Sequence, residues 1–208
     1  MTLVVKHTQD WEARFRSGDT PWEDAEVAPI VVELFREHVP QVATVLEIGC
    51  GLGTAALWLA RQGHHVVACD IAPGAVRVAQ ERARRAGLAI ELRVADVLAD
   101  TTSLPLSDVV LDRGVLHTFV AQEGRVAFAA AVARLLQPGG LWLDVSGSAE
   151  TPGDRAAAAA HGFPRLTLTQ IVAAVEPHFA ILAVKQAKYG ISHGRTDFLA
   201  FAGVFRRR

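Results

Sequence analysis

The sequence has few cysteines, almost no net charge and no long hydrophobic run. Two of its 208 residues are cysteines, and both Cys50 and Cys69 fall at the ends of expected buried strands, so we expect no disulfide framework. Lysine and arginine total 21 against 22 acidic residues, for a net charge of −1. This balance offers no basic surface to nucleic acid or to an anionic membrane. No apolar segment reaches the length that spans a bilayer.

The first residues also lack a leader pattern. Met1–His7 has neither the charged start nor the apolar core of a signal peptide, so we expect a cytoplasmic protein with neither nucleic-acid nor membrane partners. Half of the residues are hydrophobic and 21% are charged, which suits a single domain, residues 1–208, with a sizeable core. The sequence leaves the oligomeric state open.

Apolar runs alternate with amphipathic segments along most of the chain. The patterns predict strands at 43–48, 65–69, 90–94, 108–112 and 141–145, and helices at 24–39, 53–62, 73–87, 122–136 and 167–175. Residues 146–166 read as a loop with a short helix at 154–160. Two further strands, at about 178–186 and 196–205, have no clear helix between them, which favours a hairpin. The alternation predicts a doubly wound α/β fold around a mostly parallel sheet.

The most informative segment joins the first expected strand to its helix. Three glycines spaced two apart, Gly49, Gly51 and Gly53, follow the apolar run, and Asp70 stands at the end of the next strand. Such a turn lets the backbone approach a ligand, directs a helix N-terminus at an anionic group, and lets an acid accept ribose hydroxyls. The order therefore predicts a nucleoside pocket. The competing interpretation makes Asp70 the N-cap of a helix starting near Pro73.

Two details argue against a dinucleotide. The G-x-G-x-x-G pattern requires a later glycine where this chain has Thr54, and the strand carries an acid, Glu47, two residues before the first glycine. The chain is also short for a second mononucleotide half or a substrate domain. A nicotinamide oxidoreductase is thus a distant alternative.

The segment Glu47–Gly53 resembles the first motif of the class I S-adenosylmethionine-dependent methyltransferases. Asp70-Ile71, Ala95-Asp96-Val97 and Gln137-Pro138-Gly139-Gly140 resemble later motifs of that family. The resemblance implies S-adenosylmethionine as the cofactor and a seven-stranded sheet whose last strand is antiparallel. It implies that Asp70 holds the ribose, that Ile71, Asp96 and Val97 lie beside the adenine, and that Glu47 favours the ammonium or sulfonium side. A simple turn is the alternative role of Asp96.

A finer resemblance lies outside the cofactor motifs. The stretch Trp11–Trp22 is similar to the N-terminal signature of the thiopurine and thiol methyltransferases, which include relatives acting on halides or tellurite. It implies that residues 1–40 form a helical lid, that Trp11, Phe15 and Trp22 fold over the cofactor, and that Arg113 helps to hold it. Phe15 stands where that family often has tryptophan. The alternative is a helix packing its aromatics on the core at i, i+4 spacing.

These observations predict methyl transfer to a small-molecule acceptor, with a thiol or other soft nucleophile favoured. A thiol has an unperturbed pKa of about 8.5 and so requires no dedicated base. One alternative is an O- or N-methyltransferase in which His117 is the general base; His117 could instead cap or decorate a helix. Another alternative is a non-catalytic S-adenosylmethionine-binding protein. His193 and Arg195, in the expected hairpin, could also reach the site. No cluster has metal-ligand spacing, so we expect no metal.

Overall fold

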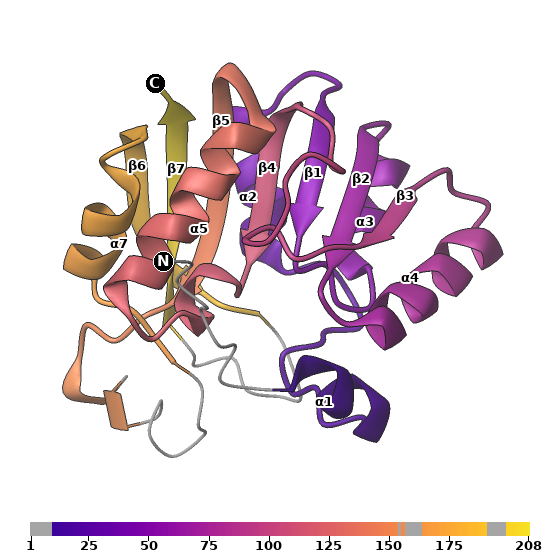
Figure 1. Cartoon of the computed structure of the whole chain (residues 1–208), viewed down its shortest axis with the longest axis horizontal. Coiled ribbons are helices and arrows are strands. Elements are labelled where there is room, and N and C mark those ends of the chain that lie inside the picture. Colours follow the sequence, from indigo (N-terminus) through magenta and orange to yellow (C-terminus); the bar gives the residue numbers. More distant parts are fainter. Residues whose placement is uncertain (1–9, 154, 157–163, 191–198) are drawn as a thin grey trace.

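The structure is a computed structural model, and it describes residues 10–153, 155–156, 164–190 and 199–208. Its centre is a seven-stranded sheet of order β3-β2-β1-β4-β5-β7-β6. The strands are β1 (Thr44–Ile48), β2 (His65–Asp70), β3 (Glu91–Val94), β4 (Ser107–Arg113), β5 (Leu136–Gly147), β6 (Phe179–Lys188) and β7 (Leu199–Arg207). β7 runs antiparallel between β5 and β6, whereas the strands from β3 to β5 pair in parallel (Figure 1). The predicted fold class and terminal hairpin are confirmed.

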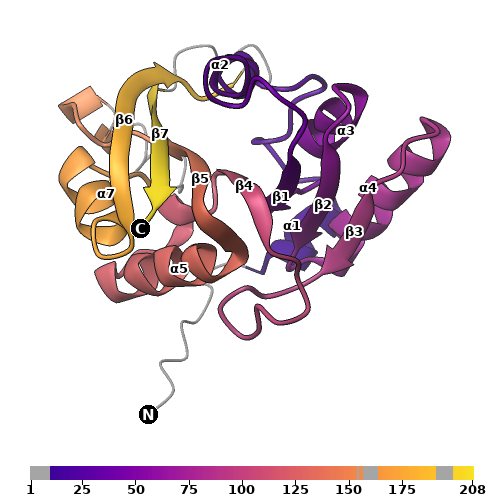
Figure 2. The same cartoon turned by 90° about the horizontal axis from the view of Figure 1, so that it is seen from above.

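Helices cover both faces of this sheet. They are α1 (Trp11–Ser17), α2 (Pro29–His38), α3 (Thr54–Arg61), α4 (Pro73–Arg85), α5 (Gln122–Leu135) and α7 (Leu168–Val175), with a 3-10 turn η1 (Leu116–Thr118). α2 and α3 lie on one face, and α5 and α7 lie on the other (Figure 2). Because every strand but the edge ones is covered twice, the central strands are apolar almost throughout. Within the described ranges, no helix has the length and apolarity that crossing a membrane requires.

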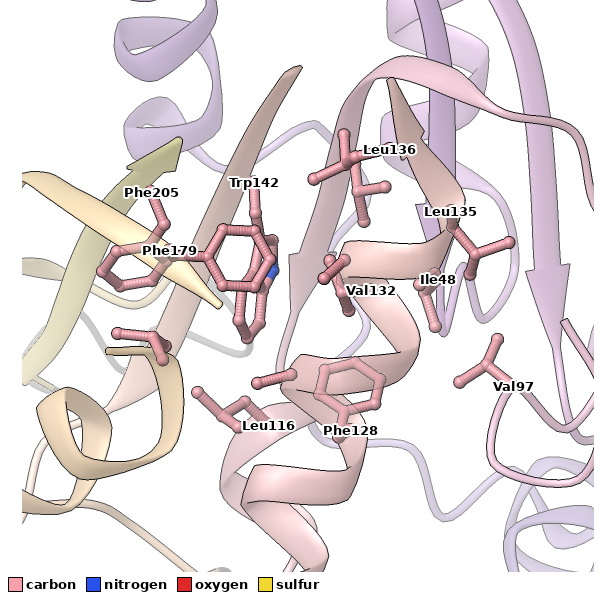
Figure 3. Packing of buried hydrophobic residues seen from close by; sticks show 14 of the residues in the cluster. Ile48, Val97, Leu116, Phe128, Val132, Leu135, Leu136, Trp142, Phe179 and Phe205 are labelled. Carbon is pink, nitrogen blue, oxygen red and sulfur yellow. The ribbon is translucent and has the colours of Figure 1, made fainter. Parts of the chain in front are cut away.

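The larger core cluster packs under α5 and α7 (Figure 3). Its centre is the indole of Trp142 on β5, which is fully buried. The rings of Phe128, Phe179 and Phe205 lie with their centroids 5.8, 5.2 and 5.3 Å from it. Edge-to-face and tilted rings at these separations pack favourably beyond their buried area. This aromatic cluster ties β6 and β7 to the parallel part of the sheet.

Two element boundaries differ from the predictions. α2 begins at Pro29 rather than at residue 24, because Glu23 accepts from the N–H of Leu52 in the glycine loop and Asp24 pairs with Arg113 at the end of β4. β5 begins at Leu136 rather than at 141. Leu136 pairs with Ser107 before the register shifts, so the predicted turn after α5 is a strand irregularity. The short helix expected at 154–160 falls mostly outside the described residues.

Candidate functional site

The glycine turn after β1 has the backbone shape that glycine permits. Gly49 and Gly51 have φ angles of +70° and +51°, in the left-handed region that other residues seldom adopt. A Cβ on Gly49 would overlap the side chain of Val115, and one on Gly51 would overlap the carboxylate of Glu23. The turn is therefore fixed both by its own torsions and by close neighbours.

Gly53 has a different role from its two predecessors. It caps α3 with φ +78°, and a Cβ there would lie 2.9 Å from the Cβ of Ala79 on α4. Its lack of a side chain lets α3 and α4 approach each other. Gly53 does not line the cavity described below, and its cofactor-binding role stays a prediction.

Asp70, at the end of β2, faces the glycine turn. Its carboxylate accepts hydrogen bonds of 2.9 Å from the backbone N–H groups of Gly51 and Ala72. Burial raises its pKa, although these hydrogen bonds oppose that shift. α4 starts at Pro73 without a side-chain cap, so the N-cap alternative is wrong. A carboxylate has about four lone-pair sites, so Asp70 can still accept a hydrogen bond from a ligand beside those from the backbone.

Asp96 follows β3 and forms a turn. Its Oδ1 accepts from the N–H of Leu98 at 2.9 Å, and its carbonyl accepts from Ala99 and Asp100. The turn interpretation of Asp96 therefore holds. The same residue also faces the cavity described next, so the two roles coexist.

A cavity of about 740 Å³ opens at the carboxyl ends of the parallel strands. At this edge of the sheet β1 lies between β2 and β4, so the order of the strands reverses there. Open α/β sheets bind ligands at such a point. Most of the residues predicted for the site line it: Trp11, Phe15, Trp22, Gly49, Gly51, Asp70, Ile71, Asp96, Val97, Arg113 and His117. Glu47 and Gly53 do not line it. His193 and Arg195 lie outside the described residues.

The N-terminal segment covers this cavity. α1 lies beyond the carboxyl ends of β1 and β2 (Figure 1), and Glu12 ties it to α4 by accepting from the N–H of Gly74 at 2.7 Å. The ring of Trp22 meets Trp11 and Phe15 edge-on, with centroids 5.5 and 5.7 Å away. These three rings thus contact one another and line the cavity. None of the α1 residues is fully buried, so the helix does not pack its aromatics into the core.

Arg113, at the end of β4, anchors the same segment. Its guanidinium donates to the carbonyls of Trp22 and Tyr189, both at 3.2 Å, and pairs with Asp24 at 2.5 Å. It also lies 4.6 Å from the centroid of the Tyr189 ring. Arg113 is therefore a clamp between chain segments that also borders the cavity. Tyr189 and Asp24 were not identified from the sequence, since neither stands in a recognisable pattern.

Glu47 is buried beneath the turn, with 5% of its surface exposed. Burial, and secondarily the charge of Glu23, raises the pKa of Glu47 to about 8. Its Oε2 has no hydrogen-bond partner among the described residues. Glu23 accepts from the N–H of Leu52 at 3.3 Å. Two carboxyl groups thus lie together behind the glycine turn, and one of them has an unused buried oxygen.

His117 lies in η1 at the other end of the cavity. Its Nδ1 accepts a hydrogen bond of 2.9 Å from the N–H of Gly147, and the ring lies 5.7 Å from that of Tyr189. Burial, followed by the positive charges of Arg165 and Arg113, lowers the pKa of His117 to about 4. The imidazole is therefore neutral at pH 7, and because Nδ1 accepts, its proton is on Nε2.

Two buried acids support this end of the site. Asp112 on β4 accepts from the N–H groups of Val115 and Leu116 and from the indole of Trp142, which orients the η1 turn. Asp144 on β5 pairs in register with Asp112; burial and then the charge of Asp112 raise its pKa well above the ordinary range. An acid inside the apolar run 141–145 is the sequence signal for this pair.

Comparison with known proteins agrees with this architecture. Residues 45–140 match the family described as "Methyltransferase domain". Residues 45–140, just under half of the chain, therefore match a methyltransferase domain, and this domain is similar to those of the class I S-adenosylmethionine-dependent methyltransferases. The chain is 38% identical over 98 residues to methyltransferase GfsG of Streptomyces halstedii, covering 46% of this chain and 34% of that protein. It is 33% identical over 116 residues to a ubiquinone biosynthesis O-methyltransferase of Xylella fastidiosa, covering 54% and 45%. The matched part thus spans less than half of these relatives.

A solved structure extends the likeness of the methyltransferase domain to nearly the whole chain. It is described as "Conversion of a Disulfide Bond into a Thioacetal Group during Echinomycin Biosynthesis". It has a TM-score of 0.80 and 26% identity, and the alignment covers 93% of this chain and 90% of that one. The alignment therefore reaches well beyond residues 45–140.

Proposed function

We propose that this protein transfers the methyl group of S-adenosylmethionine to the sulfur of a small-molecule thiol. When bound, the cofactor supplies a sulfonium-activated methyl group: a new C–S bond forms at the acceptor thiolate, the old one breaks, and S-adenosylhomocysteine leaves. The protein contributes alignment and a dry site. Holding the two reactants in line is worth about 7–11 kcal/mol of the barrier, and aromatic faces beside the sulfonium add about 0.5–2 kcal/mol.

The cavity has groups suited to each part of the cofactor. The carboxylate of Asp70 faces the cavity and suits ribose hydroxyls, and Ile71 and Val97 offer apolar surface to the adenine. Glu47 lies behind the glycine turn and does not line the cavity, so its unpartnered oxygen reaches the ammonium group only if the turn shifts when the cofactor binds. The turn at Gly49 and Gly51 has no room for a side chain. The protein backbone can therefore approach a ligand closely at this turn.

The N-terminal segment serves as the lid of this cavity in our proposal. Trp11, Phe15 and Trp22 line it on the side of α1, and the clamp at Arg113 joins that lid to β4. A closed apolar cover excludes water, which strengthens the electrostatic interactions beneath it. The arrangement supports kinship with the thiol methyltransferases, whose N-terminal aromatics the sequence resembles.

The protonation state of His117 is the observation that favours a thiol as the acceptor. With Nδ1 engaged by Gly147 and the proton on Nε2, the ring can donate a hydrogen bond into the cavity but cannot accept a proton from an acceptor. A phenol or alcohol would need such a base. A thiol reaches its nucleophilic form near neutral pH unaided. The structural neighbour whose description concerns a disulfide and a thioacetal also involves chemistry at sulfur.

A second candidate is methyl transfer to oxygen. The O-methyltransferase of Xylella fastidiosa shares 33% identity over 116 residues, and its name concerns ubiquinone biosynthesis. For this chain to act on oxygen, a base other than His117 would have to line the cavity, or the Gly147 hydrogen bond would have to break on acceptor binding.

The experiment has two stages. Calorimetry with S-adenosylmethionine tests cofactor binding, with Asp70→Asn as the variant; losing the ribose acceptors should weaken affinity about tenfold or more. Release of S-adenosylhomocysteine is then followed with matched thiophenol, phenol and aniline acceptors. We expect turnover with the thiol at least ten times faster than with the other two.

His117→Asn separates the candidates. Asparagine Oδ1 can accept from the Gly147 N–H, so the local structure is kept while the ring is lost. We expect turnover of thiophenol to fall less than tenfold, whereas loss of a general base would cost 10²–10⁴-fold. Tight cofactor binding without transfer to any of the three acceptors would instead support a non-catalytic binding protein.

A further inference from the structure

The hydroxyl of Tyr189 fills the space beside Gly114 that a side chain would occupy. A Cβ on Gly114 would overlap the oxygen of this hydroxyl and would lie 3.5 Å from Cε1 of His117. Gly114 directly follows β4 and has a φ angle of +99°, in the left-handed region that glycine adopts freely. The bare backbone therefore lets the tyrosine hydroxyl and the edge of the imidazole meet at one part of the cavity wall. We call the part of the cavity that they border the acceptor half.

Ring contacts fix the position of Tyr189, which directly follows β6. The guanidinium of Arg113 lies 4.6 Å from the ring centroid and donates to the Tyr189 carbonyl at 3.2 Å. The ring of His117 lies 5.7 Å away, tilted by 52°. Because these contacts involve the ring and the backbone, a phenylalanine at this position would lose the hydroxyl and keep the packing.

The Tyr189 hydroxyl and the Nε2–H of His117 are both available to a ligand. Nδ1 of His117 is engaged by Gly147, and neither Nε2 nor the tyrosine oxygen has a hydrogen-bond partner among the described residues. Both residues line the cavity, and neither atom is among the partnerless polar atoms that the described part of the chain buries completely. Both donors therefore open onto the cavity. The hydroxyl of Thr118, which also lines it, instead donates to the carbonyl of Val115 at 2.7 Å.

Both donors keep their protons at and around pH 7. Burial raises the pKa of Tyr189 to about 12, and burial lowers the pKa of His117 to about 4. The phenol is therefore neutral and protonated, and the imidazole is neutral with its proton on Nε2. A change of pH between these two values leaves both donors unchanged.

The charged groups near the two donors are engaged with one another. The cations that line the cavity all have interaction partners: Arg14, Arg113 and Arg165. Arg113 pairs with Asp24 at 2.5 Å, and Arg14 pairs with Asp19 at 2.9 Å. The charges that raise the pKa of the tyrosine further belong to three acids: Asp112, Asp144 and Asp24. An anion at this wall would thus meet neutral donors rather than an unpaired cation.

A thiol needs no general base, but its thiolate still has to leave water. Phe119 and Leu199 are among the apolar residues of the lining, and apolar surroundings disfavour the charged form of a group. Hydrogen bonds to the charged form favour it, and such bonds are stronger than those between neutral groups. Two protonated donors without partners, set in an apolar wall, are therefore suited to a sulfur anion.

We propose that Tyr189 and His117 bind the acceptor sulfur as a thiolate, between the phenol hydroxyl and the Nε2–H. The thiol proton passes to solvent as the acceptor binds, because Nδ1 of His117 is already occupied. A lone pair of the thiolate then forms the new C–S bond, and the electron pair of the breaking sulfonium bond stays on the cofactor sulfur. This inference rests on the proposed thiol methyltransferase function and adds the residues that hold the nucleophile.

The test counts the protons released when thiophenol binds to the protein preloaded with S-adenosylhomocysteine. Calorimetry in two buffers of different ionisation enthalpy gives this number, at a pH where most of the free thiol is still protonated. Each charge-assisted hydrogen bond shifts the ionisation of the bound thiol about tenfold or more. We therefore expect most of one proton to be released per thiophenol. Thioanisole, which has no ionisable proton, measures any release from the protein itself.

Tyr189→Phe removes one donor and keeps the ring beside Arg113. We expect it to release about half as many protons or fewer, and the pH midpoint of kcat for thiophenol to rise by about one unit, because that profile reports ionisation in the bound complex. The affinity for thioanisole and the melting temperature should be kept. Thr118→Val is the matched control: it removes a cavity hydroxyl that is already engaged, so neither the proton count nor the midpoint should move.

Three results would overturn the assignment of these donors. They are thiophenol binding to the wild type without proton release, no measurable thiophenol binding, and a proton count and midpoint that Tyr189→Phe leaves unchanged. If Tyr189→Phe does not fold, His117→Asn carries the same comparison, since it removes the other donor. Failure of S-adenosylhomocysteine to bind would instead refute the proposed function.

Discussion

His117 should make the folded protein less stable in mild acid, and His117→Asn should remove that effect. The folded protein holds the imidazole neutral, with a pKa of about 4 against an ordinary 6.5. As the pH falls through 6.5, the unfolded chain takes up a proton that the folded chain refuses until about pH 4. The free energy of unfolding therefore declines over that window and levels off below it. The difference between the folded and unfolded pKa values of His117 corresponds to about 3 kcal/mol of stability, since one pKa unit is worth about 1.36 kcal/mol.

The comparison with His117→Asn isolates this residue. Glu47, Asp70 and Asp112 have raised pKa values and also make stability depend on pH, but in both proteins alike. The difference between the two proteins thus contains the histidine alone. Asparagine preserves an acceptor for the Gly147 N–H, so a large loss of stability at pH 7 is not expected.

The assay is urea denaturation of both proteins at pH 7, 6, 5 and 4.5. We expect the wild type to lose about 2–3 kcal/mol more than the variant between the highest and lowest pH. Two-bond ¹H–¹⁵N spectra of the imidazole at pH 7 should show the proton on Nε2. A difference between the proteins that stays constant across the series, or a proton found on Nδ1, would refute the assignment of His117 as a neutral donor.

Further predictions concern the buried acids, the clamp and the glycine turn. Asp144→Asn should raise the free energy of unfolding by about 1 kcal/mol or more at pH 8 and by less at pH 5, in urea titrations, because the wild-type acid loses stability as pH rises above its unfolded pKa. Arg113→Met should lower the free energy of unfolding by about 2–4 kcal/mol, because it leaves the buried carboxylate of Asp24 uncompensated, and limited proteolysis should then cut the N-terminal segment faster. Gly51→Ala should weaken S-adenosylmethionine binding at least about tenfold in calorimetry. Gly87→Ala is its control: the φ angle is also positive, +65°, but nothing lies near the added methyl, so stability should fall while affinity is kept.

The sheet could be predicted because its strands are buried on both faces. Short runs such as 66–69 and 109–111 are apolar without interruption, and each is followed by an acid, Asp70 or Asp112, near the end of its strand. The glycine turn and Asp70 could be placed for the same reason: they follow such strands directly. The predicted boundaries are wrong where a tertiary contact overrides the local pattern. At the start of α2, for example, Glu23 accepts a hydrogen bond from the N–H of Leu52 instead of joining the helix.

The acceptor half of the cavity could not be predicted in the same way. Tyr189 and Gly147 are brought together by the pairing of β5, β6 and β7, and Arg165 joins them through the bridge between Ser148 and Leu166. None of them belongs to a local pattern that signals a site. The protonation of His117 is likewise invisible in the sequence, because it depends on which backbone N–H the ring meets in the folded chain.

The insertion of β7 between β5 and β6 has a consequence for the order of assembly. β6 is hydrogen-bonded to the sheet only through β7, and β7 is the last of the seven strands to leave the ribosome. The half of the cavity built on β1, β2 and β3 can form from residues made early in synthesis. Tyr189, which directly follows β6, acquires its place only once β7 has docked. A nascent chain would therefore gain the cofactor pocket before the acceptor pocket, and a chain stalled before β7 would have the first without the second.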